Sequence, residues 1–439
     1  MTTLVEVDHP AIRATFASAV SLHSHTNRSR EVMTPVRAYL ERIPVIASLV
    51  RRQMREYERR NGEPVDFGRG WWQPPLDPQE VLASESAQIR ETLGLRPLVS
   101  ITDHDSINAP LALRSDRSQT AVPISLEWTA PFRQTFFHLG VHNLRAASAD
   151  AMFDALADFT SAPTAGRLGE LLERLNSDPT VLVVLNHPLW DLQGVGIAEH
   201  AALLTAFLAA HAGHIHAIEI NGYRSWRENA AAMQLAADCR LPVISGGDRH
   251  GCVPNSLLNL TIANTFDEFV VEVRQRREST IVVMPEYRRA LVDRKVRVAA
   301  DAMRDYPQRP PGEQHWTDRV FYERRGETHP IADAWPRGGP VWVRCAMRAF
   351  EFAASAPMQP ILRQVVWLAG ASTSERADPL PVPAVARAAA RPDPSYTPGS
   401  IARAFPASRS SRIRTAKRTA SRVSAAHSKR SRSGTTGPG

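Results

Sequence analysis

Two histidines lie two residues apart near the start of the chain, in the stretch Leu22-His23-Ser24-His25-Thr26. In a β-strand, residues i and i+2 point to the same side, so both imidazoles would project from one strand end into one place. Imidazole is the commonest protein ligand of zinc and other transition metals. The pair therefore predicts half of a metal site, although a His-x-His pair taken alone also fits an ordinary surface or core position.

Further side chains of the same chemical kind occur along the chain, each at the end of a short apolar run or within one. They are His104, Glu127, His138, His187, Asp248 and His250. Buried imidazoles and carboxylates are costly unless they are paired or bind metal. Nitrogen and oxygen ligands without thiolates suit zinc, manganese or iron, and a carboxylate such as Glu127 could bridge two ions. We interpret the set as a site for divalent transition-metal ions.

The apolar runs that precede these residues are short, as strands are, and they alternate with segments of helical periodicity. Strands are expected at residues 98–102, 122–126 and 181–185, and helices at 201–211 and 228–240. Alternation of this kind predicts βα units and a parallel sheet, closed into a barrel. In parallel α/β folds the carboxyl ends of the strands carry the active site, so the predicted ligands would share one rim.

The chain is expected to have three parts. Residues 1–285 form an α/β domain with a helical insert at about 33–97, which could be a lid, a dimer surface or a plain packed excursion. Residues 286–370 indicate an accessory, mostly helical extension. Residues 371–439 are rich in Ala, Pro, Ser and Arg, a composition that predicts disorder.

Composition limits the classes of protein further. With 43% hydrophobic and 22% charged residues the chain is of ordinary globular type. Its cysteines, Cys239, Cys252 and Cys345, are too few and too scattered for a disulfide framework. An apolar leader and a membrane-spanning run are both absent from the sequence, so we expect a soluble cytoplasmic protein without membrane contact.

The net charge of +8 comes from the end of the chain, because residues 401–439 contain ten Lys and Arg and no Asp or Glu. Such a tail could bind nucleic acid through phosphate contacts. Its composition, without a recognisable motif, favours a solvated tail instead.

In its ordered motifs the sequence resembles the PHP (polymerase and histidinol phosphatase) superfamily over about residues 18–285. The motifs are His23-Ser24-His25-Thr26, Thr102-Asp103-His104-Asp105, Glu127, His138-Leu139-Gly140, Asn186-His187-Pro188, Glu219-Ile220-Asn221 and Gly247-Asp248-Arg249-His250. The resemblance implies a distorted (β/α)7 barrel. It also implies that the protein is a phosphoesterase that binds two or three metal ions. Such an enzyme hydrolyses a small phosphorylated substrate by means of a metal-activated hydroxide.

The resemblance also implies a role for each candidate ligand. A first ion would be held by His23, His25, Glu127 and Asp248. A second would be held by Glu127, His138 and His187, and a third by His104 and His250. Many relatives have an aspartate about five residues past the second histidine. Here Arg30 occupies that position and Glu31 follows it, so either Glu31 substitutes or the third site is weaker.

Other polar residues next to the motifs are candidates for catalysis. Asp103 and Asp105 flank His104 and are expected to orient ligands or to transfer protons. An arginine could stabilise the charge of a phosphoryl transition state, and Arg30, Arg224 and Arg249 each lie beside a motif. Of these three, Arg249 is assigned to catalysis.

Two other functions remain open from the sequence. One is an amidohydrolase-like hydrolase of a C–N or ester bond, whose common form uses a carboxylated or bridging lysine. The chain has no lysine before Lys295, which disfavours that form. The other is a PHP module that binds metal without turnover.

Overall fold

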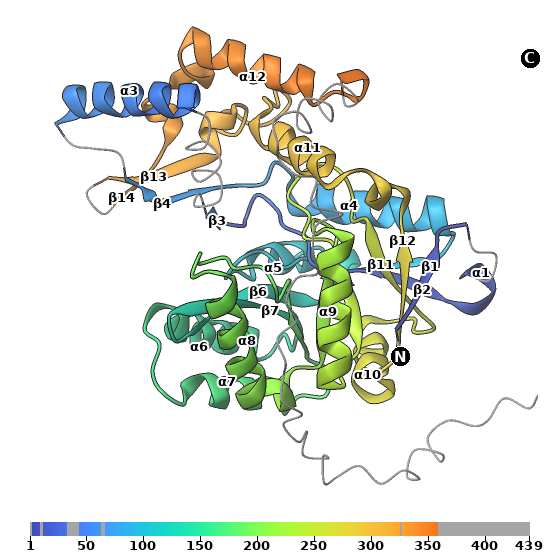
Figure 1. Ribbon diagram of the computed structural model, residues 1–439. Coiled ribbons are helices and arrows are strands. Elements are labelled where there is room, and N and C mark those ends of the chain that lie inside the picture. Colours follow the sequence, from blue (N-terminus) through green and yellow to red (C-terminus); the bar gives the residue numbers. More distant parts are fainter. Residues whose placement is uncertain (1, 9–11, 33–43, 63–65, 325–326, 359–439) are drawn as a thin grey trace, which may run out of the picture. The chain divides into compact units, whose positions relative to one another are not determined.

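The structure is a computed structural model of the 439-residue chain, and it describes residues 2–8, 12–32, 44–62, 66–324 and 327–358 (Figure 1). The chain divides into two units, residues 1–390 and 391–439, and all described residues belong to the first. The predicted disordered tail, residues 371–439, therefore lies outside the described residues. In the described part of the chain, no helix is both long and apolar enough to cross a membrane.

Two five-stranded sheets form the body of the described chain. The first has the order β1-β12-β11-β2-β5 and the second the order β10-β9-β8-β7-β6. The strands of the first are β1 (Thr2–Glu6), β2 (Ser18–Ser21), β5 (Arg96–Val99), β11 (Leu257–Thr261) and β12 (Ser279–Val283). Those of the second are β6 (Ile124–Phe132), β7 (Thr135–Leu144), β8 (Leu182–Leu185), β9 (Ala217–Asn221) and β10 (Val243–Gly246).

Helices connect and cover these strands. They are α1 (Ile12–Thr15), α3 (Pro44–Asn61), α4 (Pro78–Gln88), a π-helical turn (Ile89–Leu93), α5 (Asn108–Arg114), α6 (Ala149–Ser161), α7 (Arg167–Asn176), α8 (Ile197–His211), α9 (Trp226–Cys239), α10 (Phe266–Arg276), α11 (Leu291–Met303) and α12 (Val341–Ala353). The described fold is therefore a mixed α/β structure, as the alternation of strands and helices predicts.

The prediction of a parallel sheet is wrong for β7, which runs antiparallel to both β6 and β8, and for β11, which runs antiparallel to both β2 and β12. Only Arg133 and Gln134 separate β6 from β7, and Arg133 has a φ of 55°. A connection of two residues can form a hairpin but cannot cross over between parallel strands, so antiparallel pairing is forced. The seven-stranded βα barrel is likewise not established, because the described strands form no single closed sheet.

Backbone hydrogen bonds nevertheless join the two sheets just beyond their strand ends. After β2 and β10, the amide of Gly247 donates to the carbonyl of Leu22 at 2.9 Å, and the amide of His25 donates to Arg249 at 2.9 Å. After β5, the amide of Asp105 donates to the carbonyl of Glu127 in β6 at 2.9 Å. These bonds join the carboxyl end of β2 to that of β10, and the carboxyl end of β5 to β6.

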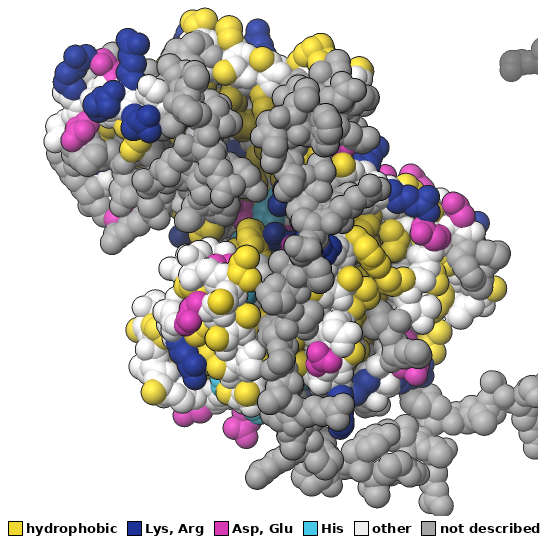
Figure 2. All heavy atoms as spheres, viewed as in Figure 1, with side chains coloured by type: hydrophobic (Ala, Val, Ile, Leu, Met, Phe, Trp, Pro, Cys, Tyr) yellow, Lys and Arg dark blue, Asp and Glu magenta, His cyan; other side chains and the backbone are white. Residues whose placement is uncertain are grey.

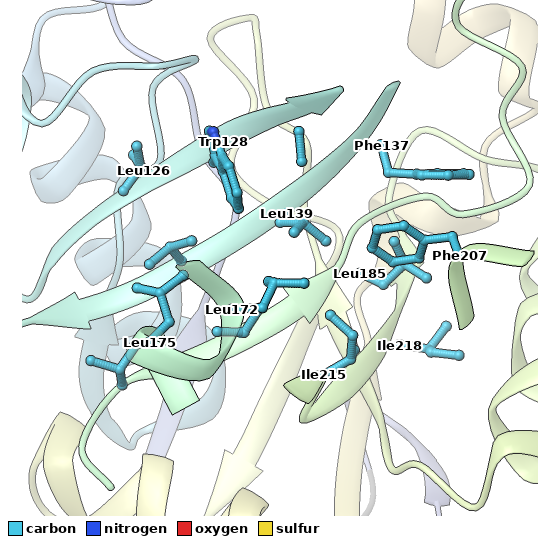
Figure 3. Close-up of a cluster of buried hydrophobic side chains, with 14 of the residues drawn as sticks. Leu126, Trp128, Phe137, Leu139, Leu172, Leu175, Leu185, Phe207, Ile215 and Ile218 are labelled. Atoms are coloured by element: carbon cyan, nitrogen blue, oxygen red, sulfur yellow. The ribbon is translucent and has the colours of Figure 1, made fainter. Parts of the chain in front are cut away.

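The largest hydrophobic core lies against the second sheet. Trp128, Leu139 and Leu185 of the sheet pack with Leu172 of α7 and Phe207 of α8 (Figure 3). Helix α7 has its buried leucines at 168, 171, 172 and 175, the spacing of one helix face. This core holds the strands of the second sheet in place, and several of these strands carry candidate ligands.

A third sheet joins two distant parts of the chain, with the order β14-β13-β4-β3. It contains β3 (Glu31–Val32), β4 (Asp66–Trp72), β13 (Val320–Arg324) and β14 (Glu327–Pro330). The predicted helical insert thus contains a strand besides α3 and α4, and the accessory segment contains two. The sequence of β4 alternates poorly and includes two glycines, so periodicity did not reveal it.

Candidate metal centre

All eight predicted ligands come together in the structure. They follow or lie within β2, β5, β6, β7, β8 and β10. Together with Glu31 they form four overlapping sets whose ligand atoms lie within 4.8 Å of one another, namely His25-Glu31-His104-His250, His23-His25-Asp248, His23-Glu127-His187 and His104-Glu127-His138. Their contacts fall into three groups, one for each ion that the sequence predicts. His23, His187 and Asp248 have φ values of 62°, 26° and 55°, in the left-handed region that side chains other than glycine rarely adopt. Such strained residues cluster at functional sites, where the surrounding structure holds them in place.

The first group consists of His23, His25, Glu127 and Asp248. Nε2 of His23 lies 3.0 Å from Oε2 of Glu127 and 3.5 Å from Oδ1 of Asp248, and Nε2 of His25 lies 3.4 and 3.5 Å from the same two oxygens. With metal–ligand bonds of about 2.0–2.1 Å, the ligand atoms of a tetrahedral site are about 3.3 Å apart. Each of the two histidine nitrogens therefore lies at coordination-shell spacing from both carboxylate oxygens.

The second group shares Glu127 with the first. Oε1 of Glu127 lies 3.1 Å from Nε2 of His187 and 3.2 Å from Nδ1 of His138. The two oxygens of this fully buried carboxylate thus face different groups of histidines. This is the arrangement expected of a carboxylate that bridges two ions.

Glu31 completes the third group. Its Oε2 lies 2.9 Å from Nε2 of His250 and 3.2 Å from Nε2 of His104, and its Oε1 lies 3.4 Å from Nδ1 of His25. Arg30 is exposed, whereas Glu31 is buried. Of the alternatives that the sequence left open, the geometry favours the one in which Glu31 takes the place of the aspartate.

Several buried atoms in these groups have no hydrogen-bond partner among the described residues. They are Nε2 of His23, Nε2 of His25, Nδ1 of His138 and Oε2 of Glu127. Leaving such atoms unsatisfied is costly, and lone pairs that face one another repel unless a cation lies between them. The donor set therefore fits divalent metal ions.

Glu219 orients the first histidine. Its Oε1 lies 2.5 Å from Nδ1 of His23, and its Oε2 accepts a hydrogen bond from the amide of His187 at 2.8 Å. A carboxylate on Nδ1 holds the proton there and leaves Nε2 free to bind metal. This role was missed from the sequence, although Glu219 stands in one of the recognised motifs.

Burial and the neighbouring imidazoles have opposite effects on the pKa of Glu127 and on that of Glu31. Burial by itself raises the pKa of Glu127, but the imidazoles of His23 and His104 outweigh it and hold the pKa well below its usual range. Burial likewise opposes ionisation of Glu31, whose pKa His250 and His104 hold well below normal. Against the effect of burial, the same contacts raise the pKa of His104 to about 10 and that of His250 to about 9, so the charges of these carboxylates are matched by those of the imidazoles that face them.

The three residues assigned to catalysis lie outside the ligand groups. Asp103 accepts hydrogen bonds from the amide and hydroxyl of Thr26 at 2.6 and 2.7 Å, and burial raises its pKa to about 7. Asp105 accepts from the amide of Thr129 at 2.8 Å. These contacts fix the loop after β2 and the strand that carries Glu127.

Arg249 requires a correction. It is fully buried, and its guanidinium donates to Glu85 at 2.7 Å and to the carbonyls of Gly251 and Cys252 at 3.1 and 3.2 Å. With its donors used in this way, it cannot contact a substrate. The pairing was invisible in the sequence because Glu85 lies 164 residues earlier, in the insert.

Arg224 is the arginine that lies beside the centre. Its Nη2 is 4.0 Å from Oδ2 of Asp248, and its guanidinium lies 3.5 Å from the centre of the Trp190 ring, which in turn is 5.3 Å from the ring of His187. Its Nε has no hydrogen-bond partner among the described residues. Figure 2 shows histidine side chains at the floor of a depression, with basic side chains next to them.

No protein-family model matches the sequence, and a search of curated proteins finds no match. Two solved structures have a distant likeness. An amidohydrolase from Chromobacterium violaceum, with bound sulfate and no metal, is 17% identical, with coverage of 40% of this chain and 83% of its own and a TM-score of 0.26. A protein described as a metal-dependent phosphoesterase from Bifidobacterium adolescentis is 14% identical, with coverage of 47% and 92% and a TM-score of 0.28. At TM-scores this low, neither likeness establishes the family.

Proposed function

We propose that the chain is a metal-dependent phosphoesterase of the PHP type, which hydrolyses a small phosphomonoester or nucleotide. The observation that carries the proposal is the position of Glu127, whose two oxygens lie within 3.4 Å of imidazole nitrogens from two different groups. Two divalent ions in such a site supply a water of lowered pKa and polarise a phosphoryl oxygen.

The strand order supports a distorted barrel around this centre. Pairing and the hydrogen bonds beyond the strand ends connect β2, β5, β6, β7, β8, β9 and β10 in a ring. Seven strands would place the ligands at one rim, since each ligand lies at the same end of its strand or in the hairpin β6–β7. The antiparallel strand β7 departs from an all-parallel βα barrel, and the barrel is distorted in this sense.

A phosphoester is the substrate class that the charges favour. The carboxylates would neutralise the ions, and Arg224 adds a cation whose Nη2 lies 4.0 Å from Oδ2 of Asp248 and whose Nε lies 3.7 Å from Oε1 of Glu228. An arginine so placed can hold the non-bridging oxygens of a phosphoryl group and stabilise the charge that develops on them. Lys295, in α11, adds positive charge near Arg224; burial and the Arg224 charge lower its pKa to about 8.

The test is metal analysis combined with a phosphatase screen. Protein purified after growth with manganese or zinc should contain two or three ions per chain and release phosphate from a panel of nucleotides, sugar phosphates and histidinol phosphate. His23→Ala and Asp248→Ala should lose both properties, whereas His214→Ala, outside the ligand groups, should keep them. Protein that stays metal-free under these conditions would contradict the proposal.

The same screen separates the two other functions. Hydrolysis of amides or lactones without phosphate release would indicate an amidohydrolase-like enzyme. Full metal occupancy without hydrolysis of any substrate would indicate a metal-binding PHP module.

A further inference from the structure

Glu31 differs from the other ligands in where it comes from. The others lie at the ends of strands in the two large sheets or within the hairpin β6–β7, whereas Glu31 is the first residue of β3, in the third sheet. Its carboxylate is held by the hydroxyl of Ser29 at 2.6 Å and faces His250 and His104. The position of its backbone therefore decides whether the third group is complete.

Strand β3 has only two residues, and such a short strand has no stability of its own. It pairs with β4, with Glu31 opposite Trp72 and Val32 opposite Trp71. Arg30, just before the strand, places its guanidinium 5.0 Å from the centre of the Trp71 ring. The place of Glu31 thus depends on β4.

Strand β4 depends in turn on β13 of the accessory segment. Val320 pairs with Trp72 and Phe321 with Trp71, and the rings of Trp71 and Phe321 stack at 3.9 Å with 13° between their planes. The amide of Gln73 also donates to the carbonyl of Arg319 at 2.8 Å. Cross-strand aromatic pairs of this kind stabilise neighbouring strands.

The same strand also contacts the third group directly. The ring centres of Trp72 and His250 are 6.0 Å apart, and Trp72 is the residue opposite Glu31. The paired residues Glu31 and Trp72 of the third sheet therefore lie against the histidines of the third group. By contrast, the first and second groups contain no residue of this sheet.

We propose that the accessory segment completes the third metal site: Phe321, through its stack on Trp71, is a positioning residue for Glu31. This inference rests on the metal centre of the proposed function. It predicts that the first two ions bind independently of the third sheet, whereas the third ion binds only when β13, β4 and β3 are paired.

The experiment counts metal ions by mass spectrometry of the full-length protein and measures manganese binding by titration. We expect wild-type protein to bind three ions and Glu31→Gln to bind two. Phe321→Ala and the milder Phe321→Leu should weaken binding of the third ion about 10–100-fold, the usual cost of losing support around a metal ligand, and leave the other two in place. Phe352→Ala, at an exposed position of α12 in the same segment, is the matched control and should bind three ions.

A double variant, Glu31→Gln with Phe321→Ala, decides whether the two residues act through one site. It should bind the same two ions as Glu31→Gln, because the effects of residues acting as one unit do not add. An unchanged affinity for the third ion in Phe321→Ala would overturn the inference. Loss of all ions in either Phe321 variant, or further loss in the double variant, would overturn it as well. Metal counts decide this even if no phosphoester is hydrolysed.

Discussion

The carboxylate of Glu85 lies 2.7 Å from Nη1 of Arg249, and both side chains are fully buried. The same carboxylate accepts hydrogen bonds from the hydroxyl of Ser21 at 2.9 Å and from the amide of Asn255 at 3.1 Å. Arg249 stands between two ligands in the sequence, and its backbone pairs with His25. An ion pair from the insert thus fixes the strand ends that carry the first group.

Breaking this pair should destabilise the protein strongly. Glu85→Gln leaves the Arg249 guanidinium buried without a counter-charge, so the free energy of unfolding should fall by about 3–5 kcal/mol. Urea denaturation followed by circular dichroism measures the change. The double variant Glu85→Gln with Arg249→Met removes the stranded charge and should recover part of the loss. A Glu85→Gln protein as stable as wild type would show that the pair contributes nothing.

Glu219 should control metal affinity rather than substrate binding. Glu219→Gln replaces a carboxylate that holds the Nδ1 proton of His23, and we expect metal affinity to fall about 10–100-fold. Competition with a metal-binding dye gives the affinity. Glu278→Gln, in the exposed connection between α10 and β12, serves as the control. Equal affinities in the two variants would argue against an orienting role for Glu219.

Arg224 should act on turnover. Because its guanidinium lies beside Asp248 but outside the ligand groups, Arg224→Ala should keep its metal and lose about 100–1,000-fold in kcat, the usual effect of removing a donor that stabilises transition-state charge. Steady-state kinetics on the best substrate of the screen provide the measurement, with the exposed Arg276→Ala as control. A variant with wild-type kcat would remove Arg224 from the proposed chemistry.

His216 makes the fold sensitive to acid. Burial, with Arg274 and Arg277 nearby, lowers its pKa to about 3, and its Nδ1 accepts a hydrogen bond from the amide of Val183 at 2.8 Å. The unfolded chain takes up this proton near pH 6.5 and the folded chain does not, so the stabilising contribution is complete above pH 6.5 and decreases towards pH 3.

Between pH 4.5 and 6, this one group should make stability rise with pH by about 1.4 kcal/mol per unit. His216→Gln cannot titrate, so its stability should depend less steeply on pH by about that amount in urea denaturation over this range. An unchanged slope would mean that His216 is protonated in the folded protein.

The candidate ligands could be found from the sequence because each depends only on a local rule. His23 and His25 follow the first of the short apolar runs, and His104 and His187 follow others, each after one polar residue. Strand alternation does not place His23, however, because this residue lies beyond the end of β2 with a φ of 62°. The hairpin β6–β7 could not be oriented from the same runs, since apolar periodicity is identical for parallel and antiparallel strands. The short turn at Arg133 is what makes the two strands antiparallel. This turn lacks the Asn-Gly sequence of common hairpins, so the sequence does not reveal it.

Contacts between distant segments are what the sequence could not provide. Arg249 stands beside a ligand, which suggested catalysis, but its partner Glu85 belongs to the insert and nothing local reveals the pair. Glu31 was recognised only as one of two alternatives, because its position depends on Trp72 and through it on Val320, almost 290 residues later. Pairings of this range are set by tertiary packing rather than by propensity.

The most direct test of the metal centre is anomalous X-ray diffraction from crystals of protein loaded with manganese or zinc. The account predicts a peak bounded by Nε2 of His23, Nε2 of His25, Oε2 of Glu127 and Oδ1 of Asp248, at about 2.0–2.2 Å from each atom, and a second peak beside Oε1 of Glu127. Crystals of the loaded protein that show no anomalous density among these four side chains would contradict it.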